Sequence, residues 1–459
     1  MRDLNSGVLG VSLLLALTGV TASGCDCGGE VINMDDAGRT PRDAGSDANG
    51  GGEVDAPAED TNTPPVDTNA MPADAWVPEG IDASVGMALN CVHAHRLNED
   101  YFRLSRDGNA DNPPATAVAT REGEMVGVYS STDFVAGSGE RNLEVFRRNA
   151  AGEIIAPAII PSTVGANLPA VVPTTDGYWI AYQQGGNVFV SRVNATFTMA
   201  TPAMVGTGPI TVAPQLVKTS TGGFVAWVSG GRIQGRSLNA SGAPLGAEAM
   251  LVAGPVQHMT LQRVGPADAV SLTWSNGTTR PSVAPLTVAT ATLGTIMPLA
   301  GEFGAFSSLD TAGQSVAVMG GRALDGAGVY DLEDGASRDV VFRVLSESGG
   351  TALPAATVAF GGDSAWAPSV DSYLSGYLIA YRARLAGGTR TFLRVGYLDR
   401  NGCELGRVTD RFPLGQIDSE RGAAPQITTS GGDVLIVWSD ATDAFNEYWA
   451  ATMTCTERM

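Results

Sequence analysis

The densest grouping of metal-binding residue types is Cys91-Val-His93-Ala-His95, which holds two of the three histidines in the chain. On a β-strand, residues two apart share a face, so a thiolate and two imidazoles could project together toward a zinc ion. Each two-residue step spans about 6.6 Å, however, which suits two ligands better than three from one strand. We therefore expect the exposed face of a strand here, and no metal site.

Three further patterns approach known sites without completing them. Residues 107–112 (DGNADN) alternate oxygen donors as a calcium loop does, but they lack the glycine at the sixth position and the glutamate at the twelfth. Residues 308–313 (SLDTAG) approach the sialidase-type Asp-box, with the glycine one place late and no tryptophan after it. His258 has no nucleophile-elbow serine around it. The sequence therefore predicts no catalytic residue and no cofactor.

The start of the sequence has the layout of an export signal with a lipid anchor. Residues 7–20 (GVLGVSLLLALTGV) follow an arginine and form an apolar segment too short to span a bilayer, which needs about 20 apolar residues. Residues 22–25 (ASGC) then resemble the lipobox of bacterial lipoproteins, with alanine where leucine is commoner. The resemblance implies a signal peptide over residues 1–24 and acyl chains on Cys25 as a membrane anchor. An ordinary secretory signal, with Cys25 paired to Cys27, is the alternative.

A polar, acidic segment over residues 25–84 follows the anchor. Between positions 26 and 85 there are 14 Asp and Glu against two Arg, which is most of the net charge of −20. The segment has almost no periodic apolar pattern, so we expect a disordered tether that lifts the folded part off the membrane. The remaining chain is only mildly acidic, and it lacks the clustered basic surface that nucleic-acid binding needs.

Seven repeats between residues 110 and 459 indicate the fold that must position any site. In four of them a proline stands 13 positions before a closing aromatic residue: Pro169 and Tyr182, Pro214 and Trp227, Pro368 and Tyr381, Pro425 and Trp438. Three degenerate copies end at Tyr129, Trp274 and Met319. Such repeats, with Gly-rich turns between short strands, are typical of β-propeller blades. We expect an all-β, seven-bladed β-propeller of four-stranded blades over residues 85–459, with the closing aromatic residues packed between blades.

The strands of the last repeat predict how the ring closes. The third repeat has four expected strands, over residues 215–220, 224–229, 232–239 and 249–252. The seventh has three, over residues 426–429, 434–438 and 448–455. Its outer strand should come from residues 87–96, and this would pair the first part of the propeller with the last. Cys91 and Cys455 then lie on adjacent strands, and we expect a disulfide, with Cys403 as a competing partner for either.

Long connections are expected between the second and third strands of three repeats. They cover residues 131–141, 320–337 and 439–446, whereas the matching connections in the second to fourth repeats are short. Long polar loops on one rim of a propeller are where binding sites usually lie. The candidate ligand-binding residues are Asp133, Arg322, Asp325, Asp331, Asp334, Arg382, Asp440 and Asp443. Solvated loops without a specific role are the alternative.

The tether and the repeats together resemble repeat-containing lipoproteins of high-GC Gram-negative bacteria, which have DAG-rich tethers and blades of the form AP…GGFVVAW. The resemblance implies a fold and a cell-envelope location, and no activity. We expect the outer membrane or cell surface over the inner membrane, and the choice stays open because Asp26 after the cysteine favours inner-membrane retention in enteric bacteria. We expect a surface-tethered, non-catalytic binding or scaffold lipoprotein that recognises a glycan, a peptide or an envelope protein. The alternative is an extracytoplasmic carbohydrate-active hydrolase or lyase with acidic residues on the long-loop face.

Overall fold

The computed structural model divides the chain into two units, Met1–Val85 and Gly86–Met459. It describes residues 89–93, 102–107, 116–132, 141–256, 258–264, 268–275, 282–298, 316–319, 326–334, 337–345, 356–357, 364–373, 376–384, 391–398, 404–413, 425–442 and 445–457. The signal peptide, the lipidation site Cys25 and the tether lie outside these residues. Within them, no helix is long and apolar enough to cross a membrane.

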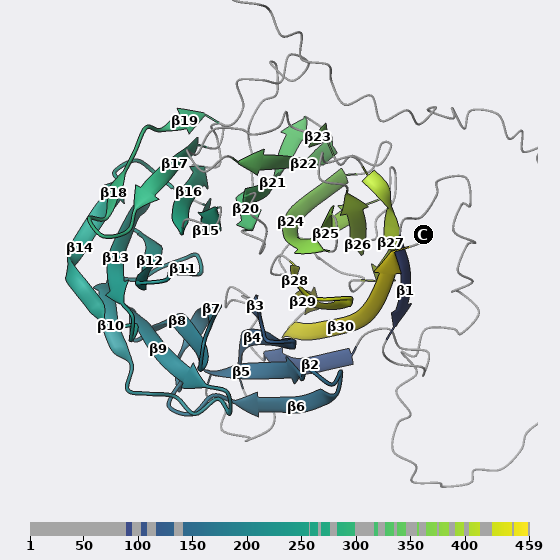
Figure 1. Cartoon of the computed structure of the whole chain (residues 1–459), viewed down its shortest axis with the longest axis horizontal. Coiled ribbons are helices and arrows are strands. Elements are labelled where there is room, and N and C mark those ends of the chain that lie inside the picture. Colours follow the sequence, from purple (N-terminus) through teal and green to yellow (C-terminus); the bar gives the residue numbers. More distant parts are fainter. Residues whose placement is uncertain are drawn as a thin grey trace, which may run out of the picture. The chain divides into compact units, whose positions relative to one another are not determined.

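The described strands of the second unit form seven hydrogen-bonded sheets (Figure 1). The first three sheets are β3 (Thr116–Arg121), β4 (Glu124–Thr132), β5 (Arg141–Arg148), β6 (Ile154–Ile159); β7 (Asn167–Thr174), β8 (Gly177–Gln184), β9 (Asn187–Asn194), β10 (Ala203–Thr207); and β11 (Gln215–Lys218), β12 (Gly222–Ser229), β13 (Arg232–Asn239), β14 (Pro244–Val252). The next two are β15 (His258–Val264), β16 (Ala269–Ser275), β17 (Ser282–Thr287) with β18 (Thr292–Leu293) and β19 (Met297–Pro298); and β20 (Val316–Met319), β21 (Gly326–Asp334), β22 (Ser337–Leu345), β23 (Ala356–Thr357). The last two are β24 (Ser364–Tyr373), β25 (Gly376–Arg384), β26 (Thr391–Leu398), β27 (Glu404–Pro413); and β28 (Gln426–Ser430), β29 (Asp433–Thr442), β30 (Phe445–Glu457) with β1 (Leu89–His93) and β2 (Phe102–Asp107).

The first strands of these sheets follow one another around a centre. They are neighbours in the order β3, β7, β11, β15, β20, β24, β28 and back to β3. The prediction of an all-β propeller with four-stranded blades is therefore confirmed. Side chains are described in six of the sheets, and sheet β20–β23 is described by its backbone alone. The count of seven blades stays a prediction.

The ring-closing sheet combines the two ends of the propeller unit. Strand β30 pairs with β29 on one edge, and on the other edge with both β1 and β2. Strand β1 lies opposite the C-terminal part of β30, with Leu89 opposite Glu457 and His93 opposite Met453. Strand β2 lies opposite the N-terminal part, from Asp107 opposite Asn446 onward. The expected outer strand from residues 87–96 is confirmed, whereas β2 was not expected.

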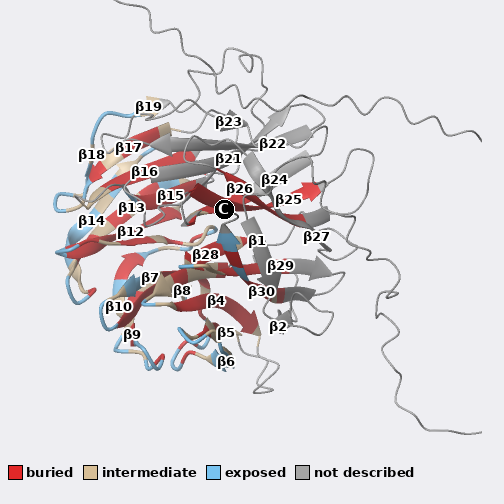
Figure 2. Cartoon of the chain, turned by 45° about the vertical axis from the view of Figure 1, so that its right-hand side comes forward, coloured by how far each residue is buried: buried red, intermediate tan, exposed pale blue. Residues whose placement is uncertain are grey.

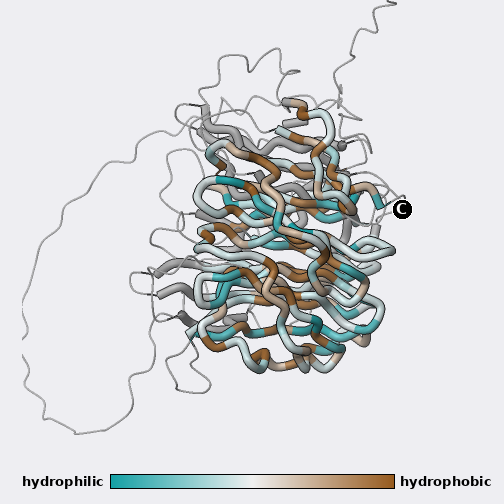
Figure 3. The backbone as a smooth tube through the Cα atoms, turned by 90° about the vertical axis from the view of Figure 1, so that its left-hand side faces the viewer, coloured by the Kyte–Doolittle hydropathy of each residue, from teal (hydrophilic) through white to brown (hydrophobic). Residues whose placement is uncertain are grey.

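Packing between sheets buries the closing aromatic residues, as predicted. Of those whose side chains are described, Tyr129, Tyr182, Trp227, Trp274, Tyr381 and Trp438 are all buried. The second strands are buried along almost their whole length, and Figure 2 shows this buried interior with exposed turns around it. The outer strand β14 is mostly exposed, and Figure 3 shows hydrophobic and hydrophilic residues interspersed along this rim.

The predictions of two long loops are wrong, because strands occupy most of these residues. Residues 326–334, expected within a loop over 320–337, form β21, the second strand of its sheet, and the Val316–Met319 segment is the first strand rather than the second. This repeat has no anchoring proline to fix the alignment, and Val329 and Tyr330 favour a strand. The expected loop over 439–446 lies almost entirely within β29 and β30, because Phe445 and Tyr448 extend the hairpin past Trp438.

Candidate functional site

The two ends of the sheets define two sides of the propeller. The opening-turn side is the end at which the first strand turns into the second, as between Arg121 and Glu124. The long-loop side is the end at which the second strand turns into the third. In sheets β7–β10 and β11–β14 this second connection is a tight glycine turn, Gly185-Gly186 and Gly230-Gly231, whose four residues all have positive φ. Glycine adopts that conformation without strain, so these two sheets end abruptly on the long-loop side.

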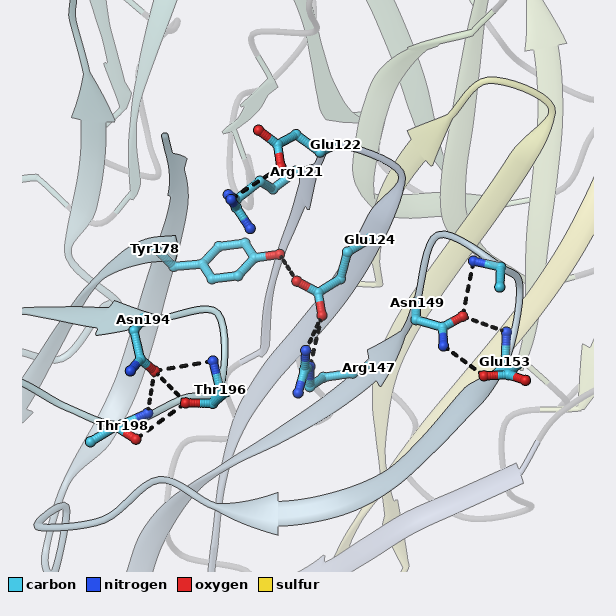
Figure 4. Close-up of polar contacts among 11 residues, drawn as sticks. Arg121, Glu122, Glu124, Arg147, Asn149, Glu153, Tyr178, Asn194, Thr196 and Thr198 are labelled. Carbon is cyan, nitrogen blue, oxygen red and sulfur yellow. Dashed lines mark hydrogen bonds and ion pairs between the residues drawn. The ribbon is translucent and has the colours of Figure 1, made fainter. Parts of the chain in front are cut away.

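A buried ionic cluster on the opening-turn side joins two sheets (Figure 4). The Tyr178 hydroxyl on β8 donates a 2.7 Å hydrogen bond to Glu124 Oε2 on β4, and Arg147 Nε on β5 donates to Glu124 Oε1 at 2.8 Å. Arg147 also lies over the Phe197 ring, 5.1 Å from its centroid. Burial, reinforced by the hydrogen bond to Glu124, raises the pKa of Tyr178 well above its usual value, so the hydroxyl remains a donor. Both carboxylate oxygens of Glu124 are bonded, so we assign the cluster to holding the sheets together.

The buried charged residues have an uneven distribution around the ring. Among described side chains they are Glu124, Glu144, Arg148, Arg382 and Arg394. All five belong to sheets β3–β6 and β24–β27, which flank the ring-closing sheet. Burying a charge is costly unless it is paired or hydrogen-bonded, so this arrangement needs a structural or functional reason.

Glu144 is the buried acid of the long-loop side. Its side chain, on β5, accepts a 2.5 Å hydrogen bond from Ser131 Oγ on β4. Tyr129 lies directly opposite it in the strand register, and the Tyr129 ring stacks on Tyr448 of β30 with centroids 5.0 Å apart. Burial first, and then the Glu144 carboxylate, raises the pKa of Tyr129 well above its usual value. A carboxylate, a hydroxyl and two tyrosines therefore meet in the interface between sheet β3–β6 and the ring-closing sheet.

Arg382 occupies the next interface on the same side. It follows the closing residue Tyr381 on β25, is buried, and donates from Nη2 to the Ser439 carbonyl of β29 at 2.7 Å. Arg382 was predicted to be a candidate ligand-binding residue. It lies on strand β25, and its hydrogen bond joins this strand to β29 beneath the long-loop side. Arg394 on β26, opposite Tyr381, is buried in the same sheet.

The other predicted ligand-binding residues are only partly located. Asp133, Arg322, Asp325 and Asp443 lie outside the described residues. The backbone places Asp331 and Asp334 on β21 and Asp440 on β29. Asp334, opposite Ser337, and Asp440, opposite Glu447, lie near the long-loop ends of their strands.

The remaining sequence patterns are scattered over the chain. Cys91 and His93 lie on β1, Asp107 ends β2, and His258 begins β15. His95 and residues 308–313 lie outside the described residues. Where side chains are described, no group of three or more His, Cys, Asp or Glu could hold a metal ion.

Sequence reasoning missed Glu144, Arg394 and Gln234, which share one structural position. Each lies opposite the closing aromatic residue, in the third strand of its sheet. In sheet β11–β14 the reason is visible, because Trp227 Nε1 donates to Gln234 Oε1 at 3.0 Å. The hairpins between these partners differ in length, so spacing in the sequence does not align them. Only the strand register brings them to the same position.

Comparison with known proteins gives no family. No protein-family model matches the chain, and no curated protein does. A protein of unknown function from Dyadobacter fermentans DSM 18053 is 13% identical, with a TM-score of 0.44, and the match covers 81% of this chain and 100% of that one. A prolyl endopeptidase structure is 11% identical with a TM-score of 0.45, over 77% of this chain and about half, 51%, of that one. The Dos1 propeller is 10% identical with a TM-score of 0.40, over 76% and 93%. Likenesses this distant leave ligand and activity open.

Proposed function

We propose that the protein is a surface-tethered, non-catalytic binding propeller whose ligand contacts the long-loop side at sheets β24–β27, β28–β30 and β3–β6. The observation behind this proposal is the buried polar framework at that side: Glu144 with Ser131, and Arg382 with the Ser439 carbonyl. The ligand class is a glycan, a peptide or another envelope protein.

The contrast between sheets supports this location. Sheets β7–β10 and β11–β14 end in glycine turns, which offer a ligand little side-chain surface. In sheet β3–β6, by contrast, residues 133–140 connect β4 to β5. Binding residues that are supported by a buried, hydrogen-bonded base lose less entropy when they bind. Asp133, Asp440 and Asp443 are the acidic residues that this side would offer.

Binding can be tested on the whole chain with a glycan array and a peptide library, followed by thermal shift with each hit. We expect one class of probe to bind and to raise the melting temperature. The Asp133→Ala, Asp440→Ala and Asp443→Ala variants should weaken this binding at least tenfold. Asp176→Ala, on the opening-turn side, is the matched control and should bind normally. A triple variant that carries all three substitutions and binds the hits as tightly as the parent protein does would contradict the proposed location.

The cellular address is a separate part of the proposal. Cys25 would carry the lipid, and the protein would lie in the cell envelope, at the outer membrane or cell surface. In cells fed a clickable fatty acid, the parent protein should take up label and a Cys25→Ala variant should not. Label retained by that variant would contradict the anchor.

The number of blades is a further part of the proposal. Electron-microscopy views down the ring axis would count the blades, for which we propose seven.

A further inference from the structure

Strand β1 brings Cys91 directly opposite Cys455 of β30. The register is continuous on both sides, with Asn90 opposite Thr456 and Val92 opposite Thr454. In an antiparallel pair, directly opposed Cα atoms are about 4.5 or 5.5 Å apart. Both separations fall inside the roughly 4.4–6.8 Å range that disulfides span. The backbone thus meets the distance requirement for a bond between these two residues.

The backbone of β30 is held firmly at this point. The Cys455 amide donates to the Gly432 carbonyl at 2.7 Å, and the Cys455 carbonyl accepts a 2.9 Å hydrogen bond from the Tyr373 hydroxyl of sheet β24–β27. Cys455 is buried, in a cluster that includes Trp438 and Met453. A sulfur in this position is shielded from soluble reductants, so a bond formed there would persist.

We infer that Cys91 and Cys455 form a disulfide that fastens the N-terminal strand of the propeller to the last one. The two thiols lose two protons, and their two electrons reduce the disulfide of an oxidising thiol–disulfide partner to a dithiol, while one S–S bond forms between Cys91 and Cys455. The bond ties together two paired strands at the point where the ring closes. The inference does not depend on the ligand proposed above.

Peptide mapping tests the bond directly, because trypsin places the relevant cysteines on three different peptides. Cleavage after arginine gives residues 43–96 with Cys91, 401–407 with Cys403, and 422–458 with Cys455. The purified protein, alkylated and digested without reductant, should contain peptide 43–96 linked to 422–458. A link from either peptide to 401–407, or all three peptides alkylated singly, would overturn the inference.

The melting temperature shows whether the disulfide stabilises the closed ring or forms without any effect on stability. Parent protein that has been unfolded and refolded in reductant should melt roughly 5–10 °C below the oxidised protein, because the cross-link that closes a long loop is then absent. A Cys91→Ser/Cys455→Ser variant should melt at that lower temperature with or without reductant. Cys403→Ser should melt as the parent protein does and respond to reductant in the same way. A double variant as stable as the oxidised parent protein would overturn the inference that the disulfide fastens the two strands.

Discussion

Gly223 shows how little space remains between two sheets. A Cβ atom added there would lie 2.6 Å from Cζ3 of Trp179, the large aromatic residue of the neighbouring strand β8, and closer still to the Val217 carbonyl oxygen. Neither group can move away, since Trp179 is buried and Val217 belongs to the paired strand β11. We expect Gly223→Ala to lower the free energy of unfolding by about 1–3 kcal/mol, measured by urea denaturation. Gly254→Ala is the control, because a Cβ atom there meets nothing within 4 Å. Equal stability of the two variants would contradict this packing.

Asn239 caps a turn that recurs between third and fourth strands. Its Oδ1 accepts hydrogen bonds from the amides of Ser241 at 2.9 Å and Ala243 at 3.0 Å, and Asn149 and Asn194 make the same kind of turn. We expect Asn239→Ala to cost about 1 kcal/mol in the free energy of unfolding, because two amides lose their partner. Ser241→Ala removes only a hydroxyl and should cost less. If the two variants have equal urea midpoints, the carboxamide is not the stabilising group.

At the scale of elements, an ion pair joins β5 to β29 across the ring-closing interface. Arg148 Nη2 donates to Asp433 Oδ1 at 2.8 Å, and Arg148 Nη1 lies 2.7 Å from Oδ2. Burial acts to raise the pKa of Asp433, but hydrogen bonds from Arg148 and Thr454 and the Arg148 charge outweigh it and hold the pKa below its ordinary value. A carboxyl with a lowered folded-state pKa contributes stability above its unfolded pKa, near 3.9, and loses that contribution as pH falls through the lower folded value.

We therefore expect Asp433→Asn to lower the free energy of unfolding by about 1–2 kcal/mol at pH 7. The difference between the variant and the parent protein should shrink as pH falls below about 4 and disappear only below the lowered folded-state pKa, where the parent carboxyl is neutral in both states. Chemical denaturation at a series of pH values measures both. Asp176→Asn, in an exposed pair with Arg192, should change little at any pH. A difference for Asp433→Asn that is constant down to pH 2 would show that its charge is not the cause.

Elements with complete repeat patterns could be predicted from the sequence, and degenerate ones could not. In the third repeat, the expected strand over residues 232–239 is β13. The strands expected over 215–220, 224–229 and 249–252 are also present, with the observed bounds Gln215–Lys218, Gly222–Ser229 and Pro244–Val252. Glycine turns set those boundaries locally. The strand β21 was missed because no proline or closing aromatic residue marks its repeat. Glu144 and Arg394 were missed because strand register, which depends on hairpin length, determines their surroundings.

At the scale of the whole molecule, the edge of β30 is covered by two strands in series. Removing residues 1–96 would take away β1 and leave the part of β30 from Met453 to Glu457 with unpaired backbone groups. We expect this truncation to lower the melting temperature and to promote association through the open edge. Removal of residues 1–85, which follows the boundary between the two units, is the control and should leave both properties unchanged. Light scattering and thermal denaturation measure them, and two equally stable monomers would contradict a closing role for β1.

The same arrangement determines when the protein can finish folding. Strands β1 and β2 precede every other strand of the propeller in the chain, and the partner of both is β30, which follows all of them. During synthesis the earliest strands therefore have no place in a sheet until the latest one has emerged. Such a chain stays open until the last strand has been made, which suits the export that we propose. Once β30 arrives, it pairs with β29, β1 and β2, so a single strand completes the ring.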